Sequence, residues 1–445
     1  MGGLGGAPAR VVRVSDTPVK IALFGPGTVG SQVARLLTEQ SADLASRVGA
    51  PLEVVGVYVR DIGKDRVGLD PALLTDDADA LIAKADVVVE LMGGIEPAKS
   101  IILKAIAAGA GVVTANKALL AAHGPELYEA ADAANVDLYF EAAVAGAIPI
   151  IRPVRESLAG DHVRRILGIV NGTTNYVLDE MTARGLDYEV AVKQAQDLGY
   201  AEADPSADVD GFDAAAKAAI LASLAFHQRV PLGDVYREGI SAITAADVAA
   251  ATDSGHVIKL LAIAERTGEG GDGGVSVRVH PALVPLSHPL ASVHGAYNAV
   301  FVEAEAAGDL MFYGQGAGGT PTASAVLGDV VSVARHIARG GRGPRESHYG
   351  DLPVLPISAS SSRFQLRMTV PDRPGVLAAI AAMLAQSGVS IETVRQQAGG
   401  VGTGLATLAI ATHRAPESDV TAVLDALRSS DAVTEIRSVL RIEGE

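Results

Sequence analysis

Short apolar runs alternate with alanine-rich stretches between residue 18 and about residue 140. The apolar runs are KIALF, LEVVGVYV, DVVVELM, GVVTAN and VDLYFEA, and several of the stretches between them have the spacing of helices. Such an alternation is typical of a parallel sheet with helices on both faces. The pattern therefore predicts a doubly wound α/β domain over residues 18–145.

The alternation is lost beyond that domain. Residues 146–320 mix strands with long helical runs such as DAAAKAAILASLAFHQ, which predicts an α+β domain. Residues 341–362 are dense in glycine, proline and serine, as linkers are. Residues 363–445 then read strand, helix, strand, strand, helix, strand, the order of a ferredoxin-like βαββαβ domain.

The composition limits the classes of protein to which the chain can belong. Its 445 residues exceed what one hydrophobic core supports, so two or three domains are expected. The formal net charge of −16 argues against nucleic-acid binding, and the absence of cysteine excludes disulfides and fits a reducing cytoplasm. No apolar stretch is long enough for a membrane span, and residues 1–17 predict a flexible leader, not a signal peptide.

Residues 21–30, IALFGPGTVG, place Gly25, Gly27 and Gly30 between a predicted strand and a predicted helix. Glycines at this spacing allow a sharp turn and bring backbone N–H groups close to a pyrophosphate, which predicts a Rossmann-type dinucleotide site. A tight strand–helix turn without a ligand is the alternative. Two glycines also end the run DVVVELMGG, at the sheet edge where ligands bind. The predicted cofactor contacts are Phe24, Gly25, Gly27, Thr28, Val29, Gly30, Arg60, Lys64 and Gly93.

The residues after the second strand bear on the choice between NAD and NADP. An acid there holds the ribose hydroxyls of NAD, whereas an arginine accommodates the 2′-phosphate of NADP. Arg60 comes first, then Asp61, with Lys64 close behind. This order favours NADP without excluding NAD, although Arg60 and Lys64 could also be solvated loop charges.

Residues 195–217, AQDLGYAEADPSADVDGFDAAAK, hold a run of acids that ends at Lys217. Asp213 and Lys217 are four residues apart and share one face of a helix. Carboxylates beside a lysine suit a substrate that carries both an ammonium group and a carbonyl or hydroxyl group. The alternative is an acidic loop that caps a helix, with Asp213 and Lys217 as an ordinary surface pair.

A second lysine, Lys117, lies in VVTANKALLA at the carboxyl end of a predicted strand. It should therefore face the same crevice as the glycine turn. Hydride transfer to a carbonyl requires a proton for the oxygen, and a lysine with a lowered pKa can supply it. Two lysines that converge on one oxygen would lower the pKa of each other. Alternatively, Lys117 is a surface residue at a helix start.

The same residues carry a family resemblance. The blocks GPGTVG, TANKALLA, FEAAVAGAIPII, VNGTTNY, REGI and FYGQGAGGTPTASAVLGD resemble those of homoserine dehydrogenases over roughly residues 18–340, and residues 363–445, with DRPGVL and SGVSIETV, resemble the ACT domain of the long bacterial form. The positions that match the homoserine dehydrogenase signature are Ala195, Gly199, Tyr200, Ala201, Asp204, Pro205, Asp208, Val209, Gly211, Asp213 and Lys217.

The resemblance implies reversible, NAD(P)H-dependent reduction of L-aspartate 4-semialdehyde to L-homoserine, in the biosynthesis of threonine, methionine and isoleucine. It implies that Lys217 donates the proton to the aldehyde oxygen and that Lys117 supports it and contacts the nicotinamide. Glu202 is expected to bind the substrate amine and Asp213 to orient the hydroxyl, with Asp208 in the same pocket. Residues 146–320 would bind the substrate and dimerise.

Further expectations come from the resemblance. Gly316 lies in a loop expected to close over the cofactor, after which a helix at about 320–340 would complete the first domain. The family often holds a structural sodium ion, and oxygen ligands suit such a hard cation. An ordinary strand end is the alternative for that segment. The candidate sodium ligands are Glu141, Val144, Gly146 and Ile148.

The ACT-like segment is expected to bind threonine, the end product of the pathway, where the turn before its first helix offers N–H groups to a carboxylate. The candidate effector contacts are Asp372, Arg373, Gly375 and Ile391. A dimerisation module without a ligand is the alternative, and a homodimer or homotetramer is expected. Two other functions stay open: another NAD(P)-dependent reductase of an amino-acid aldehyde or hydroxy acid, and a non-catalytic amino-acid sensor.

Overall fold

The computed structural model describes residues 17–64, 66, 68–268, 273–345, 349–399 and 404–444, so most of the predicted leader lies outside the described residues. The chain forms two compact units. The first contains residues up to 149 together with 317–347, and the second contains 150–316 together with the residues from 348 onward.

The first unit is built on a six-stranded parallel sheet, which confirms the predicted Rossmann-type fold. The strand order is typical of dinucleotide-binding domains. Strand residues such as Ile21 and Val88 are fully buried, because helices cover both faces of the sheet. In spatial order, the strands are β3 (Leu74–Thr75), β2 (Leu52–Tyr58), β1 (Val19–Phe24), β4 (Val87–Glu90), β5 (Gly111–Thr114) and β6 (Leu138–Tyr139).

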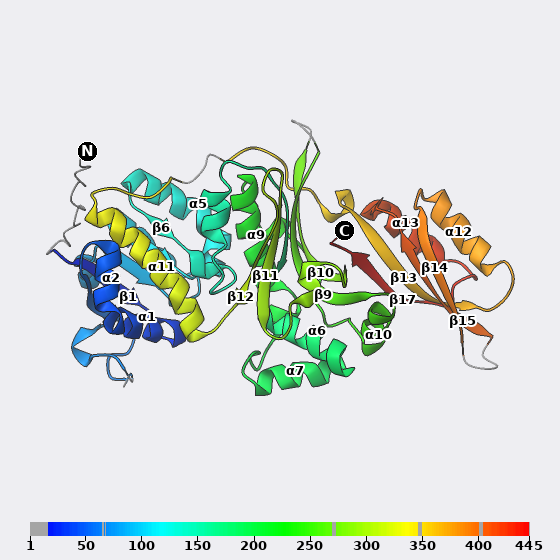
Figure 1. Ribbon diagram of the computed structural model, residues 1–445, viewed down its shortest axis with the longest axis horizontal. Coiled ribbons are helices and arrows are strands. Elements are labelled where there is room, and N and C mark those ends of the chain that lie inside the picture. The colour runs from blue at the N-terminus through cyan, green and yellow to red at the C-terminus, as the bar shows by residue number, and fades with distance from the viewer. Residues whose placement is uncertain are drawn as a thin grey trace, which may run out of the picture. The chain divides into compact units, whose positions relative to one another are not determined.

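Helix α11 (Gly319–Ala338) belongs to this first unit although it follows the second in sequence. It packs beside α1 and α2, as Figure 1 shows, and its fully buried Val326, Val330 and Val333 recur at helical spacing. The chain therefore returns to complete the first core. The other helices of this unit are α1 (Thr28–Glu39), α2 (Ser41–Val48), α3 (Ala78–Ile82), α4 (Ala98–Ala107) and α5 (Lys117–Ala134).

The second unit is organised around one large mixed sheet of 11 strands. Helix α9 (Phe212–Phe226) lies against β7, β9 and β10, and its alanine-rich sequence lets the helix approach the sheet closely. The strands of its first half are β7 (Val163–Ile169), β8 (Tyr236–Arg237), β9 (His256–Thr267), β10 (Gly274–Pro285), β11 (Tyr297–Ala304) and β12 (Gly308–Gln315). The other α-helices of this first half are α6 (Gly172–Arg184), α7 (Tyr188–Asp197), α8 (Ser206–Val209) and α10 (Ala245–Asp253).

The C-terminal part of the second unit has the predicted βαββαβ order. Its elements are β13 (Ser361–Pro371), α12 (Val376–Gln386), β14 (Ile391–Ala398), β15 (Leu405–Thr412), α13 (Glu417–Arg428) and β17 (Glu435–Ile442), with the short β16 (Ala415–Pro416) before α13. Helices α12 and α13 cover one face of this sheet, where Phe364, Leu366 and Met368 are buried against them. Helix α10 lies at the other face (Figure 1).

The two halves of the second unit share their sheet, a connection that the sequence did not predict. Strand β17 pairs in parallel with β10 and antiparallel with β13. The segment expected to be a linker also contacts this unit, since Leu355 and Val275 are joined by a backbone hydrogen bond and Val275 N–H donates to Pro353. The C-terminal domain is therefore attached by main-chain hydrogen bonds as well as by the chain itself.

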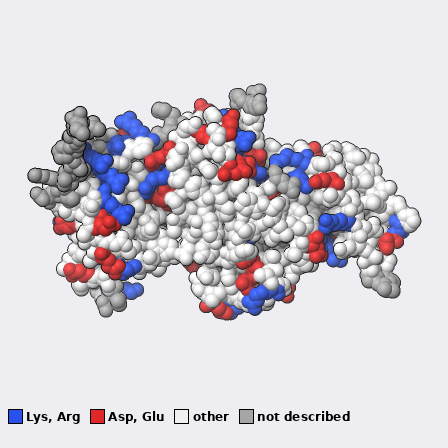
Figure 2. Space-filling model, in the orientation of Figure 1, with Lys and Arg blue, Asp and Glu red and all other residues white. Residues whose placement is uncertain are grey.

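Charged side chains of both signs are interspersed on the face shown in Figure 2. None of the helices in the described ranges combines the length and the apolar character that a membrane span requires.

Candidate active site

The glycine turn of the first unit joins β1 to α1. A Cβ atom on Gly25 would lie 2.8 Å from the backbone of Leu91, and one on Gly30 would lie 2.2 Å from the Gly25 carbonyl oxygen, so both positions require glycine. Gly27 has open space around it and precedes α1, whose first turn lacks a side-chain cap. Uncapped N–H groups beside open space suit an anion. This geometry fits a dinucleotide pyrophosphate.

The predicted contacts around that turn differ in exposure. Thr28 is exposed and Val29 is half-buried, whereas the ring of Phe24 is fully buried and stacks on Tyr58. Only the backbone of Phe24 is therefore left for the predicted contact. Arg60 and Lys64 are exposed beyond the end of β2.

A buried hydrogen-bond network, absent from the sequence predictions, shapes the neighbouring loops. The Glu90 carboxylate at the end of β4 accepts hydrogen bonds from the Gly93 N–H at 3.2 Å and from the Thr114 hydroxyl at 2.7 Å. Asn116 caps α5 and donates to the Gly94 carbonyl oxygen at 2.6 Å. These bonds fix the loop that contains Gly93 and the start of α5, where half-buried Lys117 is the first helical residue.

In the second unit, Lys217 lies on α9 with a side chain that is 9% exposed. Its Nζ atom donates to the Asp213 carboxylate at 2.7 Å and to the Val170 carbonyl oxygen at 2.6 Å. The side chain of Asp213 is 4% exposed. The alternative of an ordinary surface pair is therefore wrong, because the ion pair lies in the interior.

Asn171 connects the members of this cluster. Its side-chain amide donates to Asp208 at 2.7 Å and to Asp213 at 2.8 Å, while its carbonyl oxygen accepts from the Thr174 N–H and caps α6. The buried Asn171 therefore sets the position of both carboxylates relative to α6. The sequence signal for it was the asparagine–glycine pair before a helix in VNGTTNY.

The segment between Asp208 and Asp213, called the acidic loop below, is supported by residues 237–240. A Cβ atom on Gly239 would lie 2.4 Å from the Val209 carbonyl oxygen, and Ile240 donates a backbone hydrogen bond to that oxygen at 2.8 Å. Arg237 donates to the Asp210 carbonyl oxygen. The REGI block, residues 237–240, therefore supports the acidic loop.

Glu202 is exposed, at the edge of the buried cluster. The nearby Tyr200 carbonyl oxygen accepts a hydrogen bond from Thr173 in the first turn of α6, and the ring of Tyr200 packs on Tyr176. The loop that carries Glu202 is therefore tied to the same helix as Asn171.

Gly316 directly follows β12 and lies in close contact with Asn298. A Cβ atom on Gly316 would lie 2.0 Å from the amide nitrogen of Asn298, so packing alone requires glycine there. Asn298 is 1% exposed, and among the described residues neither of its amide atoms finds a hydrogen-bond partner. Such an amide is a candidate ligand contact that the sequence did not reveal.

The predicted sodium segment lies near the end of the first of the two chain segments that form the first unit. Glu141 is buried in a short 3-10 helix, and its N–H donates to the buried Asp329 at 2.7 Å. Ala145 and Gly146 both have a positive φ, so the chain turns back between the carbonyl groups of Val144 and Gly146. Ile148 is buried, and its N–H donates to Ala145. Among the described residues, no group of three histidine or acidic side chains could hold a metal.

Three of the predicted effector residues, Asp372, Arg373 and Gly375, lie at the turn before α12. Gly375 precedes this helix with φ +91°, and no side chain caps the helix. Asp372 and Arg373 are exposed, and Ile391 begins β14. Ile391 pairs with Thr412, level with Phe364 near the start of β13, whereas the turn follows the last residue of β13. The prediction that Ile391 shares a site with the turn is therefore wrong, because the strand register puts it at the opposite end of the sheet.

The candidate residues fall into two sets. Gly27, Arg60 and Lys117 belong to the first unit, whereas Asp213 and Lys217 belong to the second. The convergence of Lys117 and Lys217 on one oxygen stays a prediction.

Comparisons with known proteins bear on the family. Residues 149–331 match the family model described as homoserine dehydrogenase, residues 25–141 match its NAD-binding domain, and residues 364–431 match the ACT domain. The chain is 56% identical to homoserine dehydrogenase from Corynebacterium glutamicum over 96% of each chain. It is also 56% identical to homoserine dehydrogenase from Mycobacterium tuberculosis, over 96% of this chain and 98% of that protein.

Solved structures agree with these matches. The homoserine dehydrogenase from Thiobacillus denitrificans is 39% identical, with a TM-score of 0.90 over 96% of this chain and 99% of that one. A hyperthermophilic archaeal homoserine dehydrogenase in complex with NADPH is 28% identical, with a TM-score of 0.59 over 71% of this chain and 98% of that one.

Proposed function

Because the chain belongs to the homoserine dehydrogenase family and is an NAD(P)-dependent oxidoreductase, we propose that it reduces L-aspartate 4-semialdehyde reversibly to L-homoserine with Lys217 as the proton donor. The observation that carries the proposal is the buried pair of Lys217 and Asp213. The reaction would serve the biosynthesis of threonine, methionine and isoleucine, in the cytoplasm.

The nicotinamide, when bound, supplies a hydride to the aldehyde carbon. The Lys217 ammonium group gives a proton to the oxygen on which negative charge develops. Asp213, in contact with Lys217 at 2.7 Å, favours the protonated amine and orients the substrate hydroxyl. Asp208 and Glu202 attract the substrate ammonium group, and Lys117 of the first unit contacts the nicotinamide.

NADP is the preferred cofactor in this proposal. The Asp61 carboxylate accepts a hydrogen bond from the Gly63 N–H at 3.0 Å, which draws it into its own loop. Arg60 and Lys64 are exposed and offer cationic groups to a 2′-phosphate. Gly25, Gly27 and Gly30 would form the pyrophosphate turn, and Gly93 and Gly316 would contact the rest of the cofactor.

A structural sodium ion would bind the segment from Glu141 to Ile148. Its donor set, one carboxylate with the carbonyl groups of Val144, Gly146 and Ile148, consists of oxygen atoms only, as a hard cation prefers. The consecutive positive φ angles of Ala145 and Gly146 support a turn that gathers carbonyl groups.

Threonine would inhibit the enzyme through the ACT domain, at the α12 turn that contains Asp372, Arg373 and Gly375. Strand β14 is the last strand of its sheet and is largely exposed. An unpaired strand edge can add the same strand of a second copy, which supports a homodimer or homotetramer.

The test is an assay of nicotinamide absorbance with homoserine, comparing NADP with NAD and adding threonine. Turnover with homoserine, a higher kcat/KM with NADP, and loss of rate with threonine are expected. Absence of homoserine turnover with either cofactor would contradict the proposed activity. A preference for NAD would contradict only the proposed contact of Arg60 with a 2′-phosphate.

A further inference from the structure

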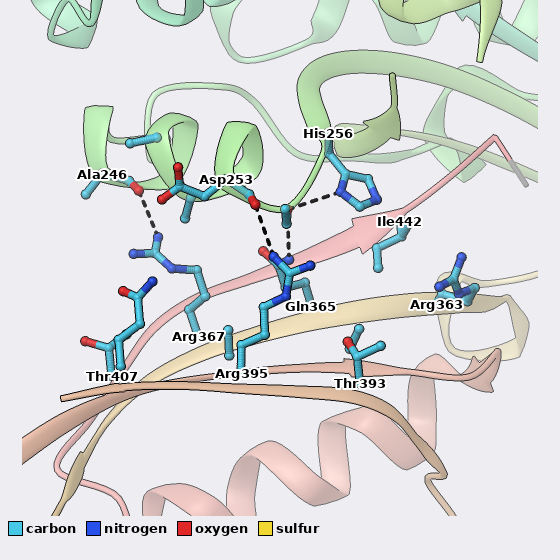
Figure 3. Close-up of a pocket in the computed structure, with 16 residues that line it drawn as sticks. Ala246, Asp253, His256, Arg363, Gln365, Arg367, Thr393, Arg395, Thr407 and Ile442 are labelled. Atoms are coloured by element: carbon cyan, nitrogen blue, oxygen red, sulfur yellow. Dashed lines mark hydrogen bonds between the residues drawn. The ribbon is translucent and has the colours of Figure 1, made fainter. Parts of the chain in front are cut away.

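Buried polar side chains of proteins normally have hydrogen-bond partners. In the cavity between α10 and the sheet of the ACT domain, for example, the buried Arg367 donates to the Ala246 carbonyl oxygen at 3.1 Å (Figure 3), and the buried Gln365 donates to the Ser254 hydroxyl group. Asn298 of β11 differs from them. It is 1% exposed, and in the described part of the chain neither its amide nitrogen nor its amide oxygen has a partner. Such an amide is costly to the free protein and points to a missing ligand.

The lack of a partner follows from the glycines that lie around the Asn298 amide. Gly314 is opposite Asn298 in the β11–β12 ladder, and Gly316 packs on the amide nitrogen. A Cβ atom on Gly172 would lie 3.4 Å from the amide oxygen. These glycines have no side chain that could donate or accept a hydrogen bond. They also allow a flat group to approach the backbone closely.

Asn298 lies on the face of the sheet against which α9 packs. Successive side chains of a strand point to opposite faces, so Asn298 shares its face with Val300. Val300 is level with Val279 in the row of paired residues that crosses β7 and β9, and Val279 lies beside Gly211 at the start of α9. The unpaired amide therefore faces the side of the sheet that carries the catalytic helix.

The strand register also places Asn298 near the proposed proton donor. Ala299 pairs with Ile169, so Asn298 is level with Val170, the next residue along the chain. The Val170 carbonyl oxygen accepts the hydrogen bond from Lys217 at 2.6 Å. Asn298 and Lys217 therefore both lie beside residues 170–172, where the chain leaves β7 and begins α6.

We propose that Asn298 binds the carboxamide group of the nicotinamide. Its amide nitrogen donates to the carboxamide oxygen, and its amide oxygen accepts from the carboxamide nitrogen. A carboxamide both donates and accepts, as the unpaired Asn298 amide requires, whereas a carboxylate only accepts and an ammonium group only donates.

The chemistry of the reaction supports this partner, and here the inference rests on the proposed function. The carboxamide is bonded to the ring carbon next to the one that carries the hydride. Hydride transfer brings that second carbon against the substrate carbon whose oxygen Lys217 protonates. The carboxamide is thereby brought to the part of the second unit where Asn298 lies.

Gly316 has to shift before the carboxamide can reach Asn298, because the amide is covered in the free chain. Gly316 is the last residue before the chain returns to the first unit, in the glycine-rich run GQGAGG of residues 314–319. Glycines permit such a change of backbone conformation at low cost. The carboxamide would then replace Gly316 as the group that packs on the amide.

The test is calorimetric titration of the full-length protein, without substrate, with NADP, with its 3-acetylpyridine analogue and with adenosine 2′,5′-bisphosphate. The analogue has a methyl group in place of the carboxamide nitrogen, and the bisphosphate lacks the nicotinamide. Asn298→Leu should weaken NADP binding about 10-fold, and it should abolish a preference for NADP over the analogue that is about 3- to 10-fold in the wild type. Binding of the bisphosphate should stay unchanged.

Gln228→Leu is the matched control. Gln228 is also a buried amide of the second unit, but its oxygen accepts a hydrogen bond from the Leu352 N–H at 2.9 Å. Gln228→Leu should therefore lower the melting temperature and leave NADP binding unchanged. Asn298→Leu removes an amide without a partner, so the melting temperature of the free protein should stay the same or rise.

Several results would overturn the inference. These are equal NADP binding by the wild type and Asn298→Leu, or an unchanged preference for NADP over the analogue in that variant. Loss of bisphosphate binding, or a melting temperature as low as that of Gln228→Leu, would assign Asn298 a structural role instead. Weaker binding of homoserine with unchanged binding of NADP would assign the amide to the substrate. Because none of these measurements requires turnover, failure of the proposed reaction is a separate result.

Discussion

Lys217 and Lys259 are both buried lysines of the second unit, but among the described residues only Lys217 contacts a carboxylate. Lys259 donates instead to the amide oxygen of Asn175 at 3.0 Å and to the carbonyl oxygen of Val293 at 2.6 Å. Burial lowers the pKa of Lys259 to about 8. Lys217 is therefore held in an ion pair, whereas Lys259 is held by neutral groups.

A lowered lysine pKa often marks a catalytic residue. Lys259 shows that it can also mark a structural one, because both of its hydrogen bonds secure interior parts of the same unit, α6 and the Val293 loop. Lys217 lies beside the acidic loop and the α6 cap. The set of partners, more than the pKa, distinguishes their proposed roles.

Among the substitutions that test this comparison, Lys217→Ala is expected to lower turnover the most. Without the proton donor, kcat should fall about 10³-fold, while binding of NADP stays near normal. Stopped-flow or steady-state turnover together with a fluorescence titration of the cofactor would measure both. Near-normal turnover would remove the assigned role of Lys217.

Glu443 extends the comparison to a buried carboxylate with cationic partners. It is 1% exposed by side chain and pairs with Arg278 at 3.3 Å and with Arg165. Glu443→Gln keeps the shape but leaves the arginines short of negative charge, so the free energy of unfolding should fall by about 3 kcal/mol. Urea denaturation would measure the loss, with the exposed Glu39→Gln as the control.

The same carboxylate predicts a pH dependence. Burial alone would raise the pKa of Glu443, but the charges of Arg278 and Arg165 outweigh burial and lower it from 4.5 to about 2. Its contribution to stability is thus fully present above about pH 4.5 and is lost as the pH falls toward about 2. The slope of unfolding free energy over that interval should be smaller in Glu443→Gln. An unchanged slope would show that other acids cause it.

Asn171→Ala should have an intermediate effect. It removes the cap of α6 and the donor that positions Asp208 and Asp213, so stability should fall by about 1–2 kcal/mol and kcat/KM by about tenfold. Asp77→Ala removes a comparable cap from α3 in the first unit and should leave kcat/KM unchanged. A similar loss of activity in both variants would indicate a purely structural role for Asn171.

Lys259→Met should have the smallest effect on turnover, within about threefold. Because the folded pKa of about 8 lies below the ordinary 10.5, the unfolded chain binds more protons between these values, and wild-type stability should rise with pH there. That rise should be absent in Lys259→Met. A large loss of kcat would assign Lys259 to the active site.

The sequence predicted the fold where the signal is local. Apolar runs such as VKIALF and the glycine turn after it specify the parallel sheet, and the strand and helix pattern beyond residue 363 specifies the ACT domain. Lys217 stood out because acids precede it. These features depend on residues close together in the chain.

Other features depend on distant contacts and could not be read in the same way. Glu90 looks like the end of an apolar strand, and its role appears only when Thr114 of the next strand lies beside it. Lys259 interrupts an apolar run without a nearby acid to draw attention to it. The pairing of β10 with β17 joins segments that carry no matching sequence motif.

The parallel pairing of Ala282 with Arg441 and of Leu283 with Ile442 has a practical consequence. Truncation after residue 362 would expose one edge of β10, a strand whose residues are all buried. It would also remove Glu443, the buried ion-pair partner of Arg165 and Arg278. Bared strands of this kind self-associate. To test the proposed threonine inhibition, point substitutions in the full-length chain are therefore better suited than removal of its C-terminal domain.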